Sequence, residues 1–319
     1  MLAVLFAAFP SLAEDKAREE ANILFLNASD LATFKPSERP RYHLEVHFTF
    51  HRPNRPDIHG TFVRDYDSPE QMHEELEFGD FRLNRVRIQN HIWTRKNDDF
   101  VPMPIEELWR ALNTTTFRMS STDVVKRVHD HKIGGVEGRC VDFENIYGNS
   151  KQDGQICVEK NIGAVIYWKY GNREISYSDY SQFVGKVRPR RFTIVEGGLD
   201  SIVADAKYTE IEAFPPDAFA PLADAESTDV CTSSRGPIVK FSPDPDYPGS
   251  IPRGLYKGKV IVDVKVAADG HVENEAVVQT VQSDLDAAAL KAVKKWHFEP
   301  GTCNGNAVTS FSKVEVTYR

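Results

Sequence analysis

The fold of the last quarter of this chain is decided by GKVIVDVKVAADGHV, residues 258–272. Valine recurs at every second position from residue 260 to residue 266, which is the period of a strand with one buried and one exposed face. Asp269 and Gly270 follow, a dipeptide that supports the positive φ angles of a tight hairpin turn. The stretch therefore predicts a strand that turns sharply into a second strand.

The residues after this hairpin predict a helix and a last strand. LDAAALKAVKKW, residues 285–296, places its apolar side chains on one helical face, and we expect the helix to start at Ser283, whose hydroxyl would cap it together with Asp286. The alternating residues from Val308 to Tyr318 predict a closing strand. Residues 244–319 are thus expected to form a small two-layer α+β domain.

The earlier part of the chain predicts an α+β fold made mostly of antiparallel strands. From residue 42 to residue 51 aromatic and aliphatic residues alternate with polar ones, and further strand-like runs continue to residue 211, with one helical interruption near Ile105 to Leu112. Such a meander must curl to hide its inner face, so we expect an antiparallel β half-barrel over residues 35–212. A helix over residues 14–34 should precede it, and a Pro-, Ala-, Asp- and Ser-rich linker over 213–243 should follow.

The first residues predict an export signal. Residues 1–13, MLAVLFAAFPSLA, are uncharged and mostly apolar, and Ser11 and Ala13 have the small-residue spacing that signal peptidase recognises. The usual basic start is missing, which a misplaced start codon and a lost part of the leader would explain. The alternatives are a truncated membrane anchor and an ordinary buried N-terminal segment. We expect export to the periplasm, with membrane association as a further alternative.

Length and charge exclude several classes of protein. A chain of 319 residues with 41% hydrophobic residues fits two folded domains. Its 39 basic and 47 acidic residues give a net charge of −8, the wrong sign for binding nucleic acid or anionic lipid surfaces. No run of about 18 apolar residues occurs, so we expect no membrane-spanning helix.

The four cysteines predict two disulfide bonds. A hairpin about Gly148 and Asn149 places Cys140 directly opposite Cys157, and cross-strand neighbours lie about 4.5–5.5 Å apart, a distance that a disulfide bridges. Cys231 and Cys303 are then left to each other by elimination. The absence of a CxxC pair disfavours zinc. Four unpaired buried cysteines in a cytosolic protein remain the alternative.

The C-terminal residues resemble the TonB C-terminal domain family. DPDYP at 244–248 is similar to the opening motif of that family, a proline, any residue, then Tyr-Pro, and the hairpin of 258–272 follows in the family's order. LDAAALKAVKKWHFEP at 285–300 is similar to the family's helix that ends in tryptophan, an aromatic residue two positions later, and proline. Trp296 should bury the helix end and Pro300 should prevent the helix from continuing. The resemblance assigns structural roles to Asp269, Gly270, Trp296, Phe298 and Pro300.

This resemblance implies a domain that grips a segment of an outer-membrane receptor or another envelope protein by adding a strand to its sheet. Strand addition needs an exposed edge, and the last strand, Val308 to Tyr318, is the candidate by position. The expected partner-binding residues are Tyr247, Pro248, Val308, Val314, Val316 and Tyr318. Because the chain shows neither a membrane helix nor a long Pro-rich spacer, we expect partner binding without energy transduction. A purely structural module is the alternative.

The strands before the linker resemble the LolA-like lipoprotein-carrier family. YSDYSQFVGKVRPRR, residues 177–191, is similar to that family's strand, Asp-Tyr pair, glycine turn and proline-entered strand. The resemblance implies a half-barrel around an apolar cavity that accepts acyl chains or another lipophile. Arginines of the ERPRYH and HRPNRPD segments, within residues 38–57, would then meet an anionic head group. An ordinary core without a cavity, with these arginines in a solvated loop, is the alternative.

Catalysis and metal binding have less support. Alternate positions of a strand lie about 7 Å apart, so His43, Glu45, His47 and His51 share one face, as do His129 and His131. Exposed strand faces often have this composition, and no GxSxG, HExxH or Gly-rich phosphate loop occurs. We therefore expect a non-enzymatic protein with no catalytic residue, no cofactor and no metal. A lipid or lipoprotein carrier and a metal-dependent envelope enzyme are the alternatives.

Overall fold

The computed structural model describes residues 12–35, 38–113, 117–147, 150–197 and 200–319 and divides the chain into two compact units. The N-terminal unit comprises the residues up to Gln89 together with Pro104–Ala225. The C-terminal unit comprises Asn90–Met103 and Glu226–Arg319. A short segment from the first third of the chain therefore belongs to the C-terminal unit.

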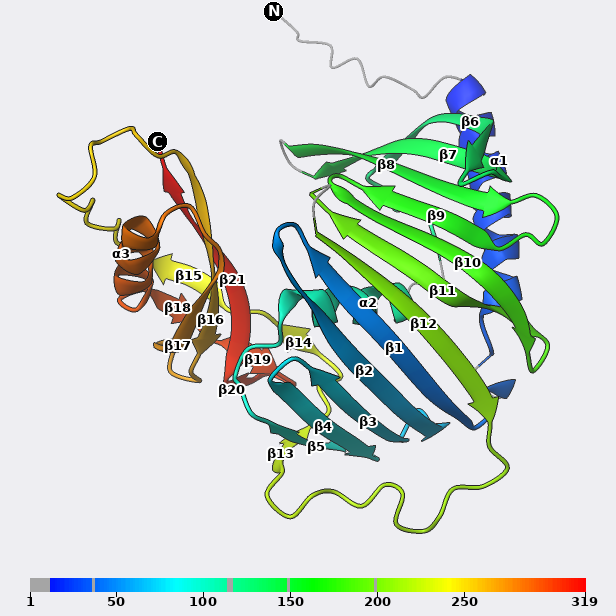
Figure 1. The fold of residues 1–319 in the computed structure, drawn as a ribbon, viewed down its shortest axis with the longest axis horizontal. Helices are drawn as coiled ribbons and strands as arrows, with labels where there is room; N and C mark the ends of the chain where they lie inside the picture. Colours follow the sequence, from blue (N-terminus) through cyan, green and yellow to red (C-terminus); the bar gives the residue numbers. More distant parts are fainter. Residues whose placement is uncertain (1–11, 36–37, 114–116, 148–149, 198–199) are drawn as a thin grey trace, which may run out of the picture. The chain divides into compact units, whose positions relative to one another are not determined.

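The N-terminal unit is built around one antiparallel sheet, which confirms the predominance of antiparallel strands (Figure 1). The strands follow the order β4-β3-β2-β1-β12-β11-β10-β9-β8-β7-β6. The strands that come first and last in the sequence of this unit, β1 and β12, are therefore paired in the middle of the sheet. The elements of this unit are α1 (Leu12–Ala32), β1 (Tyr42–Arg52), β2 (Arg55–Ser68), β3 (Gln71–Phe78), β4 (Phe81–Ile88), α2 (Met103–Asn113), β6 (Asp123–Ile133), β7 (Val136–Tyr147), β8 (Ser150–Glu159), β9 (Val165–Tyr170), β10 (Arg173–Phe183), β11 (Lys186–Glu196) and β12 (Asp200–Glu210).

The predicted alternation in β1 sets which face of the sheet is buried. Leu44, Val46 and Phe48 are at most 3% exposed, whereas His47 between them is exposed. Gly60 lies opposite Phe48 on β2, where a Cβ atom would come within 2.2 Å of the Phe48 ring. The missing side chain lets the phenyl ring lie directly on the neighbouring backbone.

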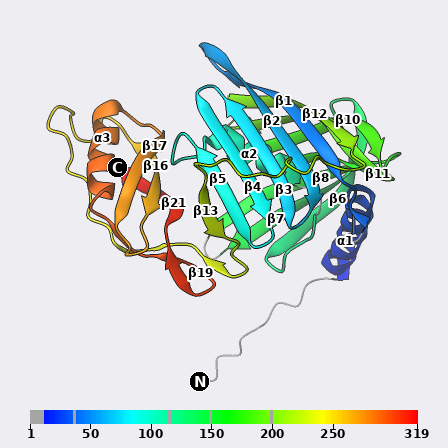
Figure 2. The same cartoon turned by 90° about the horizontal axis from the view of Figure 1, so that it is seen from below.

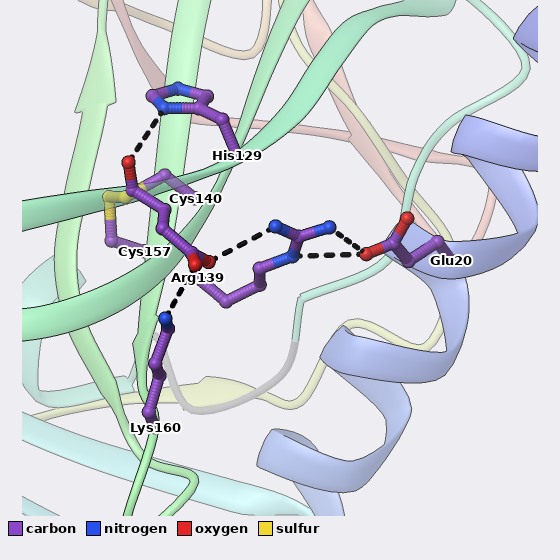
Figure 3. A network of polar contacts seen from close by, with 7 residues as sticks. Glu20, His129, Arg139, Cys140, Cys157 and Lys160 are labelled. Atoms are coloured by element: carbon purple, nitrogen blue, oxygen red, sulfur yellow. Dashed lines mark hydrogen bonds and ion pairs between the residues drawn. A yellow bond between two sulfur atoms is a disulfide. The ribbon is translucent and has the colours of Figure 1, made fainter.

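Helix α1 packs small and aromatic side chains against β6, β8 and β11 (Figure 2). Ala21, Phe25 and Ala28 are at most 2% exposed in this contact. At the helix surface, Arg139 of β7 donates from Nε to Glu20 of α1 at 3.0 Å and from Nη1 to Asp130 of β6 at 3.0 Å (Figure 3). This network is largely exposed, so the apolar contact contributes most of the stability.

Helix α2 and the strands beside it bury charged side chains. Glu74 of β3 is 1% exposed and pairs with Arg64 at 2.7 Å and with Arg85 at 2.5 Å. The Arg85 guanidinium lies 5.0 Å from the ring centroid of Trp109 on α2. Burial acts to raise the pKa of the Glu74 carboxyl, but the two guanidinium groups outweigh it and hold this pKa below its usual value.

The C-terminal unit combines a three-stranded sheet with one helix. Strands β17, β16 and β21 pair in that order, and α3 packs Leu285, Ala289 and Val293 against one face of the sheet. β5 pairs with β13, β15 with β18, and β19 with both β14 and β20. The elements are β5 (His91–Lys96), β13 (Glu226–Asp229), β14 (Ser234–Arg235), β15 (Ile238–Phe241), β16 (Gly258–Val266), β17 (Val272–Gln279), α3 (Ser283–Val293), β18 (His297–Glu299), β19 (Gly301–Cys303), β20 (Asn306–Val308) and β21 (Ser310–Tyr318).

Helix α3 begins at Ser283 as predicted, but its N-cap residue and its last residue differ from the prediction. Gln282, not Ser283, is the N-cap, and its side chain accepts the backbone N–H groups of Asp284 and Leu285. Asp286 instead accepts the N–H of Val281 at 3.0 Å, so it fastens the chain before the helix. The helix ends at Val293, and Pro300 therefore separates β18 from β19 and does not stop a helix.

Both predicted disulfide bonds are present. Cys140 and Cys157 are opposite each other in the β7–β8 ladder and are bonded, although the turn residues Gly148 and Asn149 lie outside the described residues. Cys231 is bonded to Cys303 of β19. The predicted leader lies almost wholly outside the described residues, since α1 begins at Leu12. Within the described ranges no helix has the length and apolar character needed to cross a bilayer.

The Cys140–Cys157 bond should contribute measurably to the stability of the N-terminal unit. It closes a loop of 17 residues, for which the chain-entropy estimate is about 3 kcal/mol. We expect the double variant Cys140→Ala, Cys157→Ala to lose about this free energy of unfolding in urea titration at pH 7. Reductant should destabilise the N-terminal unit of the wild type but leave that of the variant unchanged. Equal urea midpoints of unfolding for the two proteins without reductant would contradict the prediction.

The Glu74 pair should make stability depend on pH. The folded-state pKa is lowered, so its stabilisation is present above the unfolded pKa of about 4.3 and is lost as pH falls through the folded value. At pH 7, Glu74→Gln should cost about 3–5 kcal/mol because two guanidinium groups lose their buried partner. The melting temperature of this variant should fall less between pH 6 and pH 3 than that of the wild type. Glu77→Gln, at a side chain 64% exposed, is the control and should behave like the wild type.

Candidate functional site

The outer edge of β21 is the candidate site for partner binding. In the order β17-β16-β21 the central strand is β16, and β21 has a strand neighbour on one side only within the described residues. Alternate residues of an edge strand direct N–H and C=O groups away from the sheet. β21 therefore presents a row of backbone donors and acceptors that an added strand would pair with.

Side chains of β21 divide between the two faces of the sheet. Val314, Val316 and Tyr318 are buried against α3, with exposed fractions of 7, 4 and 5%. Lys313, Glu315 and Thr317 are exposed on the opposite face. The strand is thus held by one face, while its free edge is not needed for packing against the helix.

A groove of about 610 Å³ lies beside the last residues of β21. Its wall combines aromatic rings, prolines and charged side chains. The lining residues are Ser242, Pro243, Asp244, Pro245, Tyr247, Arg253, Trp296, Glu315, Val316, Thr317, Tyr318 and Arg319. Backbone pairing along the edge and side-chain contacts in the groove are therefore available to the same extended ligand.

The aromatic wall of this groove is fixed by hydrogen bonds to backbone carbonyls. Trp296 Nε1 donates to the carbonyl of Pro243 at 3.2 Å, and the Tyr247 hydroxyl donates to that of Pro252 at 3.1 Å. Tyr318 donates its hydroxyl to the carbonyl of Leu285 at 2.8 Å, and burial raises its pKa, so it stays a neutral donor. The Tyr247 and Tyr318 rings meet edge to face with centroids 6.1 Å apart. The protein's own backbone thus fixes the aromatic side chains of the groove.

The structure brings most of the predicted partner-binding residues together. Tyr247, Val316 and Tyr318 line the groove, Pro248 follows Tyr247 directly, and Val314 lies in the same strand. Val308 does not belong to this strand, because it lies in β20 and pairs with Gly301 of β19. The predicted last strand, Val308 to Tyr318, therefore begins too early, because β21 begins at Ser310. The reason is the turn at Asn304-Gly305, whose positive φ angles of 50° and 85° close a separate hairpin.

The predicted structural residues lie in the turn between β16 and β17 and in the segment that follows α3. A Cβ atom on Gly270 would lie 2.1 Å from the carbonyl oxygen of Phe298, and the φ of Gly270 is 93°, so no other residue fits this turn easily. Asp269 accepts the N–H of His271 at 3.1 Å within the turn. Trp296 lies beyond the end of α3 and contributes to the groove. The prediction did not include Pro243, Pro245 and Arg253, which lie in a segment without strand or helix periodicity.

The candidate metal ligands pair separately with neighbouring groups. His43 contacts Asp65 at 2.6 Å, His47 contacts Glu45 at 2.9 Å and His51 contacts Asp57 at 3.0 Å. On β6, His129 contacts Asp142 at 3.1 Å, and the ring centroid of His131 is 6.1 Å from that of His129. Among the described residues no three histidine, cysteine or acidic side chains converge in a way that would hold a metal ion.

One apolar cavity of the N-terminal unit, among the described residues, is small. It measures about 40 Å³ and lies between α1, α2 and neighbouring strands, lined by residues that include Leu31, Leu112, Phe117, Tyr177 and Arg188. A drug-sized ligand needs about 300 Å³ or more, whereas one water molecule takes roughly 30 Å³. An acyl chain would therefore require α1 or α2 to move.

The arginines near residue 40 are already partnered. Arg41 pairs with Asp67 at 2.5 Å, and Arg39 donates to the Tyr66 hydroxyl at 3.2 Å while lying over the Tyr66 ring. Arg188, from another strand, lies 5.3 Å from the ring centroid of Phe34 and 5.6 Å from that of Tyr208. The cation that meets the cavity is thus Arg188, which the sequence did not single out.

Solved structures similar to the chain include a LolA superfamily protein and a protein domain named for lipoprotein sorting. The LolA superfamily protein from Nitrosomonas europaea is 11% identical, with a TM-score of 0.38 over 63% of this chain and 97% of that chain. A putative outer membrane lipoprotein-sorting protein domain from Vibrio parahaemolyticus is 9% identical, with a TM-score of 0.40 over 65% of this chain and 97% of that chain.

Sequence comparison matches the part of the chain that forms the groove and the free edge. Protein TonB from Xanthomonas campestris pv. campestris is 34% identical over 93 residues, which are 29% of this chain and 39% of that protein. The chain thus spans well under half the length of this curated relative. Residues 243–319 match the family model of the Gram-negative bacterial TonB protein C-terminal domain. The free edge of β21 and most of the residues that line its groove lie in this matched stretch.

Proposed function

We propose that the C-terminal unit binds an envelope protein, such as an outer-membrane receptor segment, by accepting a strand at the outer edge of β21. The observation that carries this proposal is an edge strand whose last residues form one wall of a preformed aromatic groove. The TonB-type match of residues 243–319 supports it. On this proposal the protein is exported to the periplasm and works without catalysing a reaction.

Strand addition suits this edge energetically. Each added backbone hydrogen bond contributes about 0.5–1.5 kcal/mol net, so four or five of them give modest affinity on their own. Side chains of the partner that enter the groove beside Trp296 and Tyr247 bury apolar surface and add selectivity. We infer that the groove determines which extended segment is accepted.

The N-terminal unit would supply a second binding surface. We infer a LolA-like half-barrel over residues 35–212, a linker over 213–243 and the docking domain over 244–319. A lipid carrier is the second candidate function, because the guanidinium of Arg188, which lines the apolar cavity, lies over the rings of Phe34 and Tyr208. The carboxylate of a fatty acid would pair with that guanidinium.

A test of the lipid candidate is native mass spectrometry of the chain after incubation with palmitate. The carrier function predicts one bound palmitate in the wild type and weaker binding by Arg188→Gln. Arg190→Gln is the control, since Arg190 pairs with Asp179 and does not line the cavity. A wild type that binds no palmitate would contradict the carrier function.

Proline substitutions test the docking edge. Consecutive residues of an edge strand alternate between N–H groups that pair with the neighbouring strand and N–H groups that point outward. Among Lys313→Pro, Val314→Pro and Glu315→Pro, those that remove an outward N–H should weaken peptide binding about tenfold while the melting temperature changes little. Those that remove an inward N–H should cost about 3 kcal/mol of stability.

The probe for this test is an acetylated and amidated octapeptide that alternates valine with glutamate and lysine. Fluorescence anisotropy gives its affinity, and thermal unfolding monitors each variant. Binding that is equal in all folded variants, or absent from the wild type, would contradict strand addition at β21. Equal destabilisation by all three prolines would show that β21 is enclosed on both sides.

A further inference from the structure

Three side chains in one cross-strand row of the C-terminal sheet contact residues that are far away in the sequence. The row lies on the sheet face that α3 does not cover. Phe311 of β21 is opposite Lys265 of β16, and Lys265 is opposite Asn274 of β17. Directly opposite residues of antiparallel strands share a face, so these three side chains form one row. The row lies on the face opposite α3, since the buried valines of β16 occupy the alternate positions.

Asp99, in the loop after β5, bridges two members of this row. Its Oδ1 atom accepts a hydrogen bond from Lys265 Nζ at 3.0 Å, and its Oδ2 atom accepts one from Asn274 Nδ2 at 2.9 Å. The hydrogen bond from Asn274 is the main cause that holds the pKa of Asp99 below its usual value. The carboxylate therefore stays charged near neutral pH and spans β16 and β17.

The neighbours of Asp99 cover the third member of the row. The Phe100 ring meets the Phe311 ring edge to face, with centroids 6.0 Å apart. The Lys96 ammonium lies 4.7 Å from the centroid of the Phe311 ring, and it also donates to the backbone carbonyl of Asp99. Residues 96–100, which we name the clasp, thus contact all three strands of the sheet, and Figure 1 shows this segment beside the start of β21.

We propose that the clasp is an internal regulator of the docking edge. This inference rests on the proposed strand addition at β21. In the closed form, Phe100 and Lys96 lie over Phe311 at the start of β21. Only the last residues of β21, beside the groove, then stay accessible to a partner strand. When it opens, a partner strand pairs along the whole of β21 and binds more tightly.

The contacts of the clasp suit a reversible closure. The Asp99 and Lys265 side chains are 31% and 26% exposed, and the Phe311 ring is half exposed. Ion pairs and ring contacts with this exposure are individually weak, so the closed and open forms differ by a small free energy. A partner that pairs with the open form alone would shift this equilibrium by mass action.

The experiment compares the wild type with the double variant Asp99→Asn, Phe100→Ala in the full chain. The octapeptide that alternates valine with glutamate and lysine is the probe, and fluorescence anisotropy gives its affinity. We expect the variant to bind about threefold to tenfold more tightly, because the free energy of opening the clasp is no longer needed. Asp217→Asn, at an exposed side chain in the other unit, is the matched charge control and should bind like the wild type.

Hydrogen exchange of residues 310–313 gives a second readout that does not depend on the peptide. Their amides should exchange faster in the double variant. Lys265→Gln, which removes the cationic partner of Asp99, should also make them exchange faster. Tighter peptide binding together with faster exchange supports the clasp. Unchanged or weaker binding by a folded variant overturns it while strand addition stands.

If neither protein binds the peptide, strand addition at β21 fails. Hydrogen exchange then tests by itself whether the clasp covers the start of β21. Unchanged exchange at residues 310–313 in the double variant and in Lys265→Gln shows that it does not.

Discussion

The backbone pairing of β1 with β12 is the constraint on which the N-terminal unit depends. These strands are paired continuously from Tyr42 opposite Glu210 to His51 opposite Ser201, so residues about half the chain apart are neighbours. The pairing joins the hairpins of β1–β4 to those of β6–β12, and neither set could bury its apolar face alone. It also requires a long loop to close before the ladder forms, which makes this contact costly in chain entropy and slow to form. Helices α1 and α2 then cover apolar surface that this one sheet exposes.

Paired charges lie in the interior of that unit. Glu74 pairs with two arginines, and Glu107 of α2 lies 2.6 Å from Arg173 of β10. Burial raises the pKa of Glu107, and the positive charge of Arg173 works against this shift. Such groups are tolerated only where they compensate each other. The pair of Glu107 with Arg173 also fastens α2 to the sheet.

Much of the fold could be predicted from local patterns. The two-residue period located most strands, and the opposition of Cys140 to Cys157 followed from counting across one hairpin. The boundary at Val308 was wrong although Asn304-Gly305 is a strong turn signal. Val308 is in phase with Val314, and the serines at the two positions between them were counted as part of the same strand. Contacts such as Asp99 with Lys265 could not be predicted, since 166 residues separate them and a single carboxylate in a polar loop has no distinguishing pattern. Sequence periodicity reports on which face is buried, whereas tertiary partners of polar side chains depend on the completed topology.

The discontinuous C-terminal unit has a consequence for how the two parts of this protein can be separated. The chain passes between the units at Gln89–Asn90, at Met103–Pro104 and at Ala225–Glu226. A single proteolytic cut in the segment before β13 would therefore leave the units covalently joined through the residues around β5. The same connectivity works against genetic shuffling, because a cassette that begins at residue 226 would lose the strand that pairs with β13. The stretch that is similar to the TonB C-terminal domain is thus part of a unit that the chain enters twice, unlike a domain joined through one flexible linker.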